Sequence, residues 1–216
     1  TASFTAEAWE RAAPVRDAID ALPLVRGLGD GSLTRDRFDY YMAQDALYLA
    51  EYGRALAGVA ALSDEPDEFV FWCDAAREAV VVERALHAAH VDLTAGADAS
   101  PTCRAYTDFL RARCALGSYG VAVAAVLPCF WIYQDVGAGM IARAGDLGAH
   151  PYGDWIATYA DPGFERSTDR VRSIADRLAR AAGDGERERM HASFATACRH
   201  EWMFWDAAWR MERSPV

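Results

Sequence analysis

Apolar side chains recur at spacings of three and four along nearly all of the 216 residues, and strict alternation is nearly absent. This spacing places apolar residues on one face of an α-helix, whereas a half-buried strand would alternate them with polar residues. The chain is therefore predicted to be all-α. The predicted helices span residues 5–21, 35–60, 65–92, 101–116, 118–143, 151–160, 164–182 and 184–212.

Several helix boundaries are marked by residues that favour starts and stops. Thr34 is predicted to cap the helix that begins near residue 35, and Ser100-Pro101 is typical of a cap followed by a first-turn proline. Pro14 is expected to divide the first helical segment into two short pieces. The glycines of 27–31 predict a stop there.

Composition argues against several classes of protein. A net charge of -10 and the absence of lysine disfavour nucleic-acid binding, which needs a clustered basic face. Five cysteines without a C-x-x-C pair predict neither a disulfide framework nor a zinc ribbon. No signal segment opens the chain, and Pro128 interrupts its longest apolar run, so we expect a cytoplasmic protein without a membrane span. No linker or repeat divides residues 1–216, which predicts a single-domain helical bundle.

A cysteine lies inside the most apolar predicted helix, in the run LPCFWIY at 127–133. Tyr133 follows Cys129 by four residues, so the thiol and the phenol project from the same helical face. Pro128 removes a backbone donor directly before the thiol and can kink the helix. A buried cysteine is usually inert, but this combination points to a cysteine nucleophile in an aromatic pocket.

Two carboxylates lie on apolar helical faces, where an unpaired charge is costly. Tyrosine, methionine and leucine side chains flank Asp45, and aromatic and small side chains flank Glu201. An apolar environment raises a carboxyl pKa, which suits Glu201 to donate a proton near neutrality. For Asp45, a hydrogen bond to backbone groups or to an arginine is an equally open interpretation. For Glu201, pairing with an arginine or a tyrosine hydroxyl is the alternative to a catalytic role.

The histidines do not predict a metal site. A di-iron site on facing helices usually carries Glu-x-x-His twice, whereas Glu83 and His87 are four residues apart and His200 is adjacent to Glu201. We therefore expect paired surface residues at these positions, and neither a metal nor an organic cofactor. Heme ligation is disfavoured because all five histidines follow the first predicted helix.

Further aromatic residues and short motifs occur in a specific order, although each is weak alone. Tyr106 shares its predicted face with Phe109 and Leu110, which by itself fits ordinary core packing. The ordered set comprises LPLV at 22–25, GSL at 31–33, residues 41–49, LGS at 116–118, LPCFWIY at 127–133, HPY at 150–152 with Trp155, Ile156 and Tyr159, and EWMFWDAA at 201–208.

With these motifs the chain resembles the TenA/thiaminase II family, in its cysteine-containing branch and with a heme-oxygenase-like fold. The resemblance covers nearly the whole chain. It implies a thiamin-salvage hydrolase that acts on 4-amino-5-aminomethyl-2-methylpyrimidine, releasing ammonia and hydroxymethylpyrimidine, and on thiamin. It also implies that Cys129 attacks the pyrimidine ring and that Glu201 protonates a ring nitrogen. The implied substrate-binding residues are Asp45 at the amidine edge of the ring, Tyr48, Tyr159 and Phe204 against its faces, and Tyr106 and Tyr133 beside the thiol.

Other functions stay open beside this one. Cofactor-free oxidases and di-iron oxygenases share the scaffold, and a pyrimidine-binding or regulatory protein would need no turnover. The retained thiol and the two acids favour catalysis over binding alone. Seven tryptophans exceed what one small core needs, and relatives of this fold often form tetramers, so we expect a homotetramer. The only other expected partner is a small-molecule pyrimidine or thiamin, with no nucleic acid and no membrane.

Overall fold

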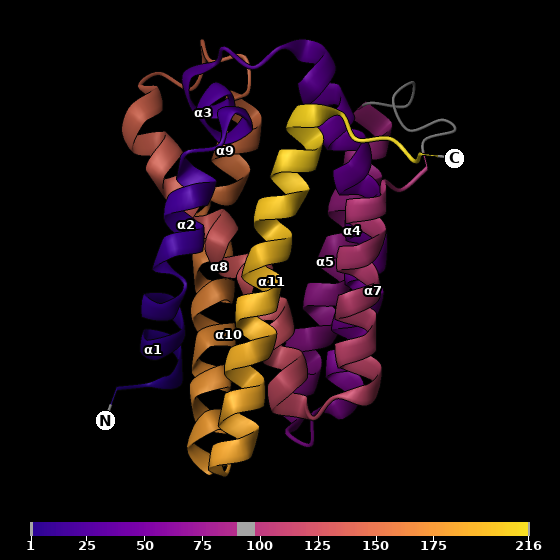
Figure 1. Cartoon of the computed structure of the whole chain (residues 1–216), viewed down its shortest axis with the longest axis vertical. Helices are drawn as coiled ribbons and strands as arrows, with labels where there is room; N and C mark the ends of the chain where they lie inside the picture. Colours follow the sequence, from indigo (N-terminus) through magenta and orange to yellow (C-terminus); the bar gives the residue numbers. More distant parts are fainter. Residues whose placement is uncertain (1, 90–97, 216) are drawn as a thin grey trace.

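The computed structural model describes residues 2–89 and 98–215, except for the side chains of residue 83 and residues 86–89. The described residues form helices joined by turns and loops, with no strand among them (Figure 1). The helices are α1 (Phe4–Arg11), α2 (Ala13–Asp20), α3 (Pro23–Asp30), α4 (Arg35–Leu62), α5 (Pro66–Ala89), α7 (Pro101–Leu116), α8 (Tyr119–Ala144), α9 (Gly153–Tyr159), α10 (Pro162–Ala181) and α11 (Asp184–Arg210).

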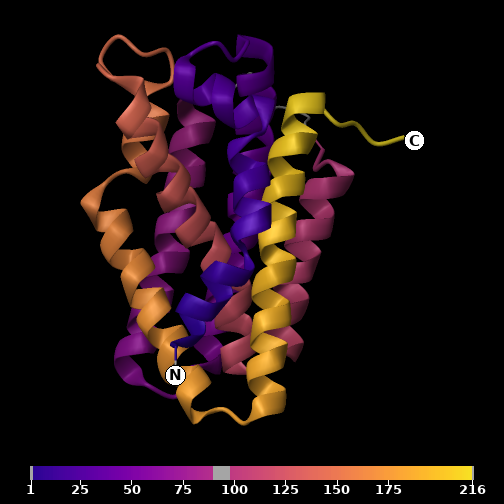
Figure 2. The ribbon, with the colours of Figure 1, turned by 60° about the vertical axis from the view of Figure 1, so that its left-hand side comes forward.

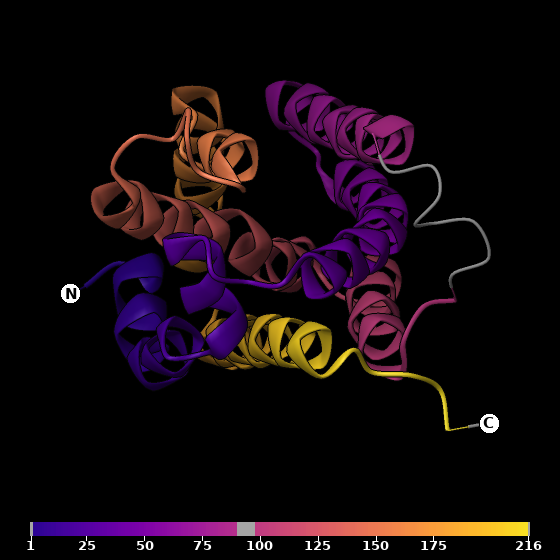
Figure 3. The same cartoon turned by 90° about the horizontal axis from the view of Figure 1, so that it is seen from above.

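The long helices run along the long axis of a bundle, and the short helices α1 to α3 pack against its side and one end (Figures 1 and 2). Helix α4 packs against α5 and α7, whereas α8 packs against α10 and α11. Seen from above, α4 and α5 stand apart from α9 and α10 (Figure 3). This arrangement divides the bundle into two groups of helices that face each other.

Helix α8 forms the centre of the core. Its side chains from Gly120 to Pro128 are all buried, and the helix continues through Pro128 without ending. Its length and composition would allow it to cross a membrane, but 78% of its most apolar stretch is buried inside the protein. The other helices therefore surround α8, which is a core helix of the bundle.

Most predicted boundaries agree with the structure to within two residues, and the all-α prediction is confirmed. The Ser100 side chain accepts a hydrogen bond from the backbone N–H of Cys103, as its cap prediction requires. The first segment divides into α1 and α2 at Ala12, and Pro14 lies in the first turn of α2, as expected. Residues 90–92 of the predicted helix 65–92 lie outside the described residues.

One local prediction was wrong. Thr34 occupies the cap position of α4, but its side chain makes no capping hydrogen bond. The stop predicted at 27–31 is confirmed at Gly31, which ends α3 in the left-handed conformation with a φ of 79°. The glycine pattern missed helix α3 itself. Gly27 lies inside this helix, where a side chain would come within 3.1 Å of Leu33.

All seven tryptophans contribute to the core of the single chain. Four are buried and three pack partly buried against the core, so their number does not itself indicate an interface. The buried four are Trp72, Trp131, Trp155 and Trp205, and the other three are Trp9, Trp202 and Trp209.

Candidate active site

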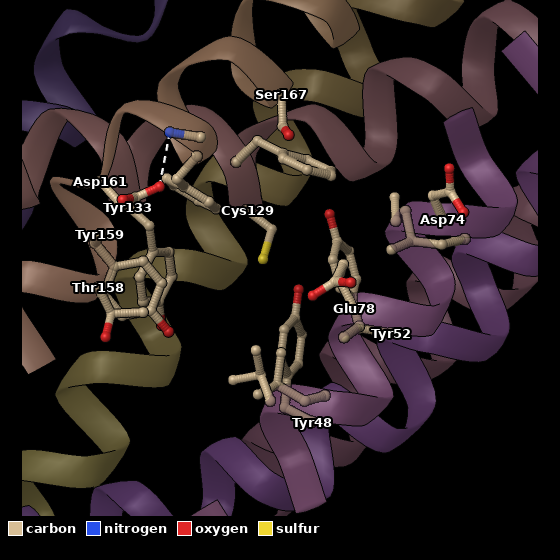
Figure 4. A pocket seen from close by; sticks show the side chains of 18 of the residues that line it. Tyr48, Tyr52, Asp74, Glu78, Cys129, Tyr133, Thr158, Tyr159, Asp161 and Ser167 are labelled. Carbon is tan, nitrogen blue, oxygen red and sulfur yellow. Dashed lines mark hydrogen bonds between the residues drawn. The ribbon is translucent and has the colours of Figure 1, made fainter. Parts of the chain in front are cut away.

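A cavity of about 470 Å³ lies between α4 and α5 on one side and α8, α9 and α10 on the other (Figure 4). Its volume falls within the usual range of roughly 300–1,000 Å³ for small-molecule sites. The walls are mainly apolar and aromatic, with a few polar groups. The polar and aromatic lining residues include Asp45, Tyr48, Tyr52, Asp74, Glu78, Cys129, Phe130, Tyr133, Thr158, Tyr159, Asp161 and Ser167.

The thiol of Cys129 projects into this cavity from α8 (Figure 4). Tyr48 and Tyr52 lie on one side of it, and Tyr133 and Tyr159 lie on the other. Burial raises the pKa of the thiol well above its ordinary value, and the negative charge of Glu201 adds to this shift, whereas the hydroxyls of Tyr48 and Tyr52 oppose it. The thiol is therefore protonated at neutral pH in the free protein, and a protonated thiol is a weaker nucleophile than a thiolate.

Tyr52 was not among the residues predicted from the sequence, although it lies beside the thiol. Its hydroxyl donates a 2.9 Å hydrogen bond to the backbone carbonyl of Val126, two residues before Pro128. The signal was present in the sequence, because Asp45, Tyr48 and Tyr52 follow one another at three and four residues and so share one face of α4.

Asp45 lies at the buried end of the cavity with 2% of its surface exposed. Its Oδ2 atom has no hydrogen-bond partner among the described residues, so neither a backbone group nor an arginine satisfies it there. Burial raises the pKa of Asp45 to about 7. A buried carboxylate oxygen without a donor is costly, so this position favours a ligand that brings its own N–H groups.

Glu201 is 1% exposed and accepts a 2.6 Å hydrogen bond from the hydroxyl of Tyr106. Burial raises the pKa of Glu201 to about 8; the bond from Tyr106 opposes the shift and the charge of Asp45 adds to it. Both buried acids therefore hold their protons to higher pH than an exposed carboxyl group, and Glu201 is shifted the further of the two. Two carboxyl groups in different surroundings suit different roles in one reaction.

Of the eight residues predicted for the site, five line the cavity and three lie behind its wall. The five are Asp45, Tyr48, Cys129, Tyr133 and Tyr159. The other three are Glu201, Tyr106 and Phe204, and they surround Tyr48: its ring centroid is 5.0 Å from that of Tyr106 and 5.5 Å from that of Phe204. Glu201 is joined to this group through the hydroxyl of Tyr106 and so lies close behind the cavity lining.

The opposite wall is a group of contacting aromatic rings. The ring centroids of Tyr133 and Tyr159 are 4.8 Å apart, and Tyr159 lies at the same distance from Trp155. The hydroxyls of Tyr133 and Tyr41 are 3.1 Å apart and share a hydrogen bond. Such a wall can hold a flat heteroaromatic ring by stacking, which contributes about 1 kcal/mol per well-placed pair.

Within the described residues, no group of three or more histidine, cysteine or acidic side chains could hold a metal ion. The side chains of Glu83 and His87, which the sequence analysis considered, lie outside that description. Cys129 is the cysteine that lines the cavity; Cys73 is exposed, and Cys103, Cys114 and Cys198 are buried elsewhere.

Comparisons with known proteins agree with this fold. A TenA homologue protein from P. horikoshii OT3 superposes with a TM-score of 0.86 at 25% sequence identity, covering 97% of this chain and 99% of that chain. A domain of unknown function from Shewanella denitrificans OS217, with a heme oxygenase-like fold, superposes with a TM-score of 0.76 at 14% identity, covering 96% and 92% of the two chains. The expected heme-oxygenase-like fold is thereby confirmed.

Relatives are also evident in sequence. A thiamine biosynthesis multifunctional protein ThiED from Corynebacterium efficiens is 39% identical over 96% of this chain, which spans only 28% of that protein's length. An aminopyrimidine aminohydrolase from Halalkalibacterium halodurans is 32% identical over 96% of both chains. The TENA/THI-4/PQQC family model matches residues 9–211. The protein therefore belongs to the TENA/THI-4/PQQC family.

Proposed function

We propose that this protein is an aminopyrimidine aminohydrolase of thiamin salvage. It hydrolyses 4-amino-5-aminomethyl-2-methylpyrimidine to the hydroxymethylpyrimidine and ammonia, and it cleaves thiamin at the same methylene carbon. The observation that carries the proposal is a thiol and an unsatisfied carboxylate, Cys129 and Asp45, on the walls of one aromatic cavity. The aminopyrimidine aminohydrolase of H. halodurans, aligned over nearly its whole length, supports it.

In this proposal the cavity binds the pyrimidine through two kinds of contact. The carboxylate of Asp45 accepts hydrogen bonds from the amidine edge of the ring, because its Oδ2 atom has no other donor among the described residues. Tyr133 and Tyr159 stack against the ring or border it, together with Tyr48 on the facing wall. Tyr106 and Phe204 fix the position of Tyr48 from behind.

The proposed reaction needs a nucleophile and an acid. Glu201 gives its proton to a ring nitrogen, which turns an electron-rich ring into an electrophile. The sulfur of Cys129 forms a bond to a ring carbon and gives its proton to the amine, which then leaves the methylene as ammonia. Water adds its hydroxyl to the methylene, its other proton returns to the sulfur as the carbon–sulfur bond breaks, and the ring nitrogen returns its proton to Glu201. The net change is amine plus water to alcohol plus ammonia.

We also propose that residues 1–216 act as one domain, that the protein is cytoplasmic, and that it forms a homotetramer. The single core around α8 supports the first point. The net charge of -10 fits a small-molecule partner better than nucleic acid.

A second candidate is a pyrimidine-binding protein without turnover, and the observation in its favour is the thiol held in its protonated form. One assay distinguishes the two candidates. The protein is incubated with the aminomethylpyrimidine and, in parallel, with thiamin, and the ammonia and hydroxymethylpyrimidine that are released are measured. Equal amounts of both products support the hydrolase. Binding without ammonia supports the second candidate, and thiamin cleavage alone would move the function to a thiaminase. Stoichiometric iron in protein purified without chelator would instead favour an oxygenase.

A further inference from the structure

The charge of the cavity walls has one sign. A smaller hollow adjoins the cavity and shares Tyr159 and Asp161 with it. Among the described residues that line either space, each charged side chain is a carboxylate and none is an arginine or a histidine. These carboxylates are Asp45, Asp74, Glu78, Asp161 and Glu165.

Four of these acids lie toward the outside, in two pairs on facing walls. Asp74 and Glu78 are four residues apart on α5 and are exposed. Asp161 and Glu165 are four residues apart at the start of α10 and are exposed as well. Figure 4 shows Asp74 and Asp161 on opposite sides of the Cys129 thiol. A ligand group that points outward from the thiol therefore passes between carboxylates.

The four acids differ in how far their charge is already balanced. Glu78 forms an ion pair with Arg77 at 2.6 Å, and Asp161 accepts a 2.7 Å hydrogen bond from the backbone N–H of Gly163 as the cap of α10. Neither Asp74 nor Glu165 has an ion pair or a side-chain hydrogen bond among the described residues, and of these two only Asp74 lines the larger cavity. Asp74 therefore presents the least compensated negative charge on the α5 wall.

An independent observation points to a ligand in the same cavity. The Oδ2 atom of Asp45, which is 98% buried, has no donor among the described residues, so a molecule with N–H groups would satisfy it. In a pyrimidine held by its amidine edge, the 5-methylene is attached to the ring carbon next to the one that bears the amino group. In the proposed binding mode its leaving group extends along the cavity, past the thiol and toward the outer acids.

We propose that the outer carboxylates, chiefly Asp74, select substrates whose leaving group is a cation and reject those that carry a phosphate. This inference rests on the proposed hydrolase function and extends it to the choice of leaving group. The aminomethylpyrimidine carries an ammonium group and thiamin a thiazolium, whereas the hydroxymethyl product is neutral. The outer acids thus attract both substrates and do not retain the product.

The test compares two ligands that differ in charge and little in size. Binding of the 5-aminomethyl and the 5-hydroxymethyl pyrimidine is measured at pH 7 by calorimetry, at low and high salt, in a Cys129→Ala background that prevents turnover. Asp74→Asn should weaken binding of the aminomethyl compound about threefold at low salt, as expected for one charge across a solvated gap. The hydroxymethyl compound should bind unchanged. The matched control is Asp108→Asn, which removes an exposed acid of α7 that does not line the cavity.

Reversing the charge at residue 74 should give a larger change in binding. Asp74→Arg should weaken binding of the aminomethyl compound about tenfold at low salt. The difference in affinity from the Asp74 protein should become smaller at high salt, because salt screens the charge. In the protein with an intact thiol, the same change should raise cleavage of thiamin monophosphate relative to thiamin. Equal effects of Asp74→Asn on both pyrimidines, or none on either, would overturn the inference while leaving the hydrolase function standing. Failure of both pyrimidines to bind and of the wild type to release ammonia would overturn both.

Discussion

The hydroxyl of Tyr106 donates a 2.6 Å hydrogen bond to Oε1 of Glu201 and so joins α7 to α11 directly behind the cavity wall. Each of the two side chains is 1% exposed, so the bond forms in an environment that disfavours a charged carboxylate. Burial dominates and raises the pKa of Glu201 to about 8. An acid that keeps its proton at neutrality therefore lies behind the cavity wall, close enough for its charge to raise the pKa of the Cys129 thiol when it ionises.

The first prediction concerns pH. If protonated Glu201 is the acid, kcat/KM should fall above a pKa near 8, because the ionised form cannot protonate the ring. Glu201→Gln should lower kcat by about 10²- to 10⁴-fold, the usual contribution of general acid catalysis. Its residual activity should lack the alkaline decline. A variant that keeps both the rate and the decline would remove Glu201 from the mechanism.

The second prediction concerns Tyr106→Phe. The bond from Tyr106 opposes the rise in the pKa of Glu201, so its loss should move the alkaline limb of activity to higher pH. The variant also leaves a buried carboxyl oxygen without its donor, which should lower the free energy of unfolding by about 1–3 kcal/mol. Steady-state pH profiles and urea denaturation measure the two effects. A limb that moves to lower pH would contradict this account.

The third prediction links the two buried acids to stability. Folding raises the pKa of Asp45 to about 7 and that of Glu201 to about 8, from about 4 in an unfolded chain. The folded state therefore holds protons that the unfolded state has released, so their contribution to stability is present below pH about 4 and lost as pH rises through 8. Glu201→Gln and Asp45→Asn should each flatten this part of a plot of unfolding free energy against pH. A slope as steep as that of the wild type in both variants would show that neither acid is shifted.

The fourth prediction uses two glycines of α8. A methyl group on Gly137 would lie 3.0 Å from the backbone carbonyl carbon and the Cβ of Tyr159, so Gly137→Ala should displace Tyr159. We expect a higher KM for the pyrimidine and an unfolding free energy lower by about 1–3 kcal/mol, as for other overpacked sites. The control is Gly139→Ala, where the nearest atom is the mobile end of Arg143 at 3.6 Å. That variant should keep its KM and gain up to about 1 kcal/mol from helix propensity. Similar KM values for the two variants would exclude Tyr159 from substrate binding.

The fifth prediction concerns Tyr52. Its hydroxyl lowers the pKa of the Cys129 thiol, so Tyr52→Phe should raise that pKa further. The rate of alkylation of Cys129 by iodoacetamide at pH 8 should fall, and turnover with it. Tyr40→Phe, which removes a hydroxyl bonded to the Glu212 carbonyl outside the cavity, should change neither. An unchanged alkylation rate in Tyr52→Phe would show that Tyr52 does not affect the pKa of Cys129. The role of Tyr52 would then be limited to its hydrogen bond with α8.

Sequence pattern predicted the long helices well, because each carries an apolar stripe at helical spacing that needs a core to cover it. Helix α3 was missed because glycine is read as a helix stop, whereas Gly27 is required by the approach of Leu33. That approach is a tertiary contact, and no local pattern contains it.

The candidate site was predicted in part for the same reason. Cys129 and Asp45 stood out because polar groups on an apolar face are costly, and both line the cavity. Tyr52 was not predicted, since the carbonyl that it binds is on another helix. Asp74 was not predicted either, because local sequence does not show that α10 lies across the cavity from it. The bond between Tyr106 and Glu201 likewise depends on packing between helices.

The most direct test of the central claim is ammonia release by Cys129→Ala, measured together with pyrimidine binding. The account predicts that turnover falls to background while the dissociation constant of the hydroxymethylpyrimidine stays unchanged, since the thiol attacks the ring but does not hold it. Cys73→Ala, which alters an exposed cysteine outside the cavity, should keep full activity. Turnover by Cys129→Ala within a few-fold of the wild type would contradict the account, because the reaction would then need no thiol.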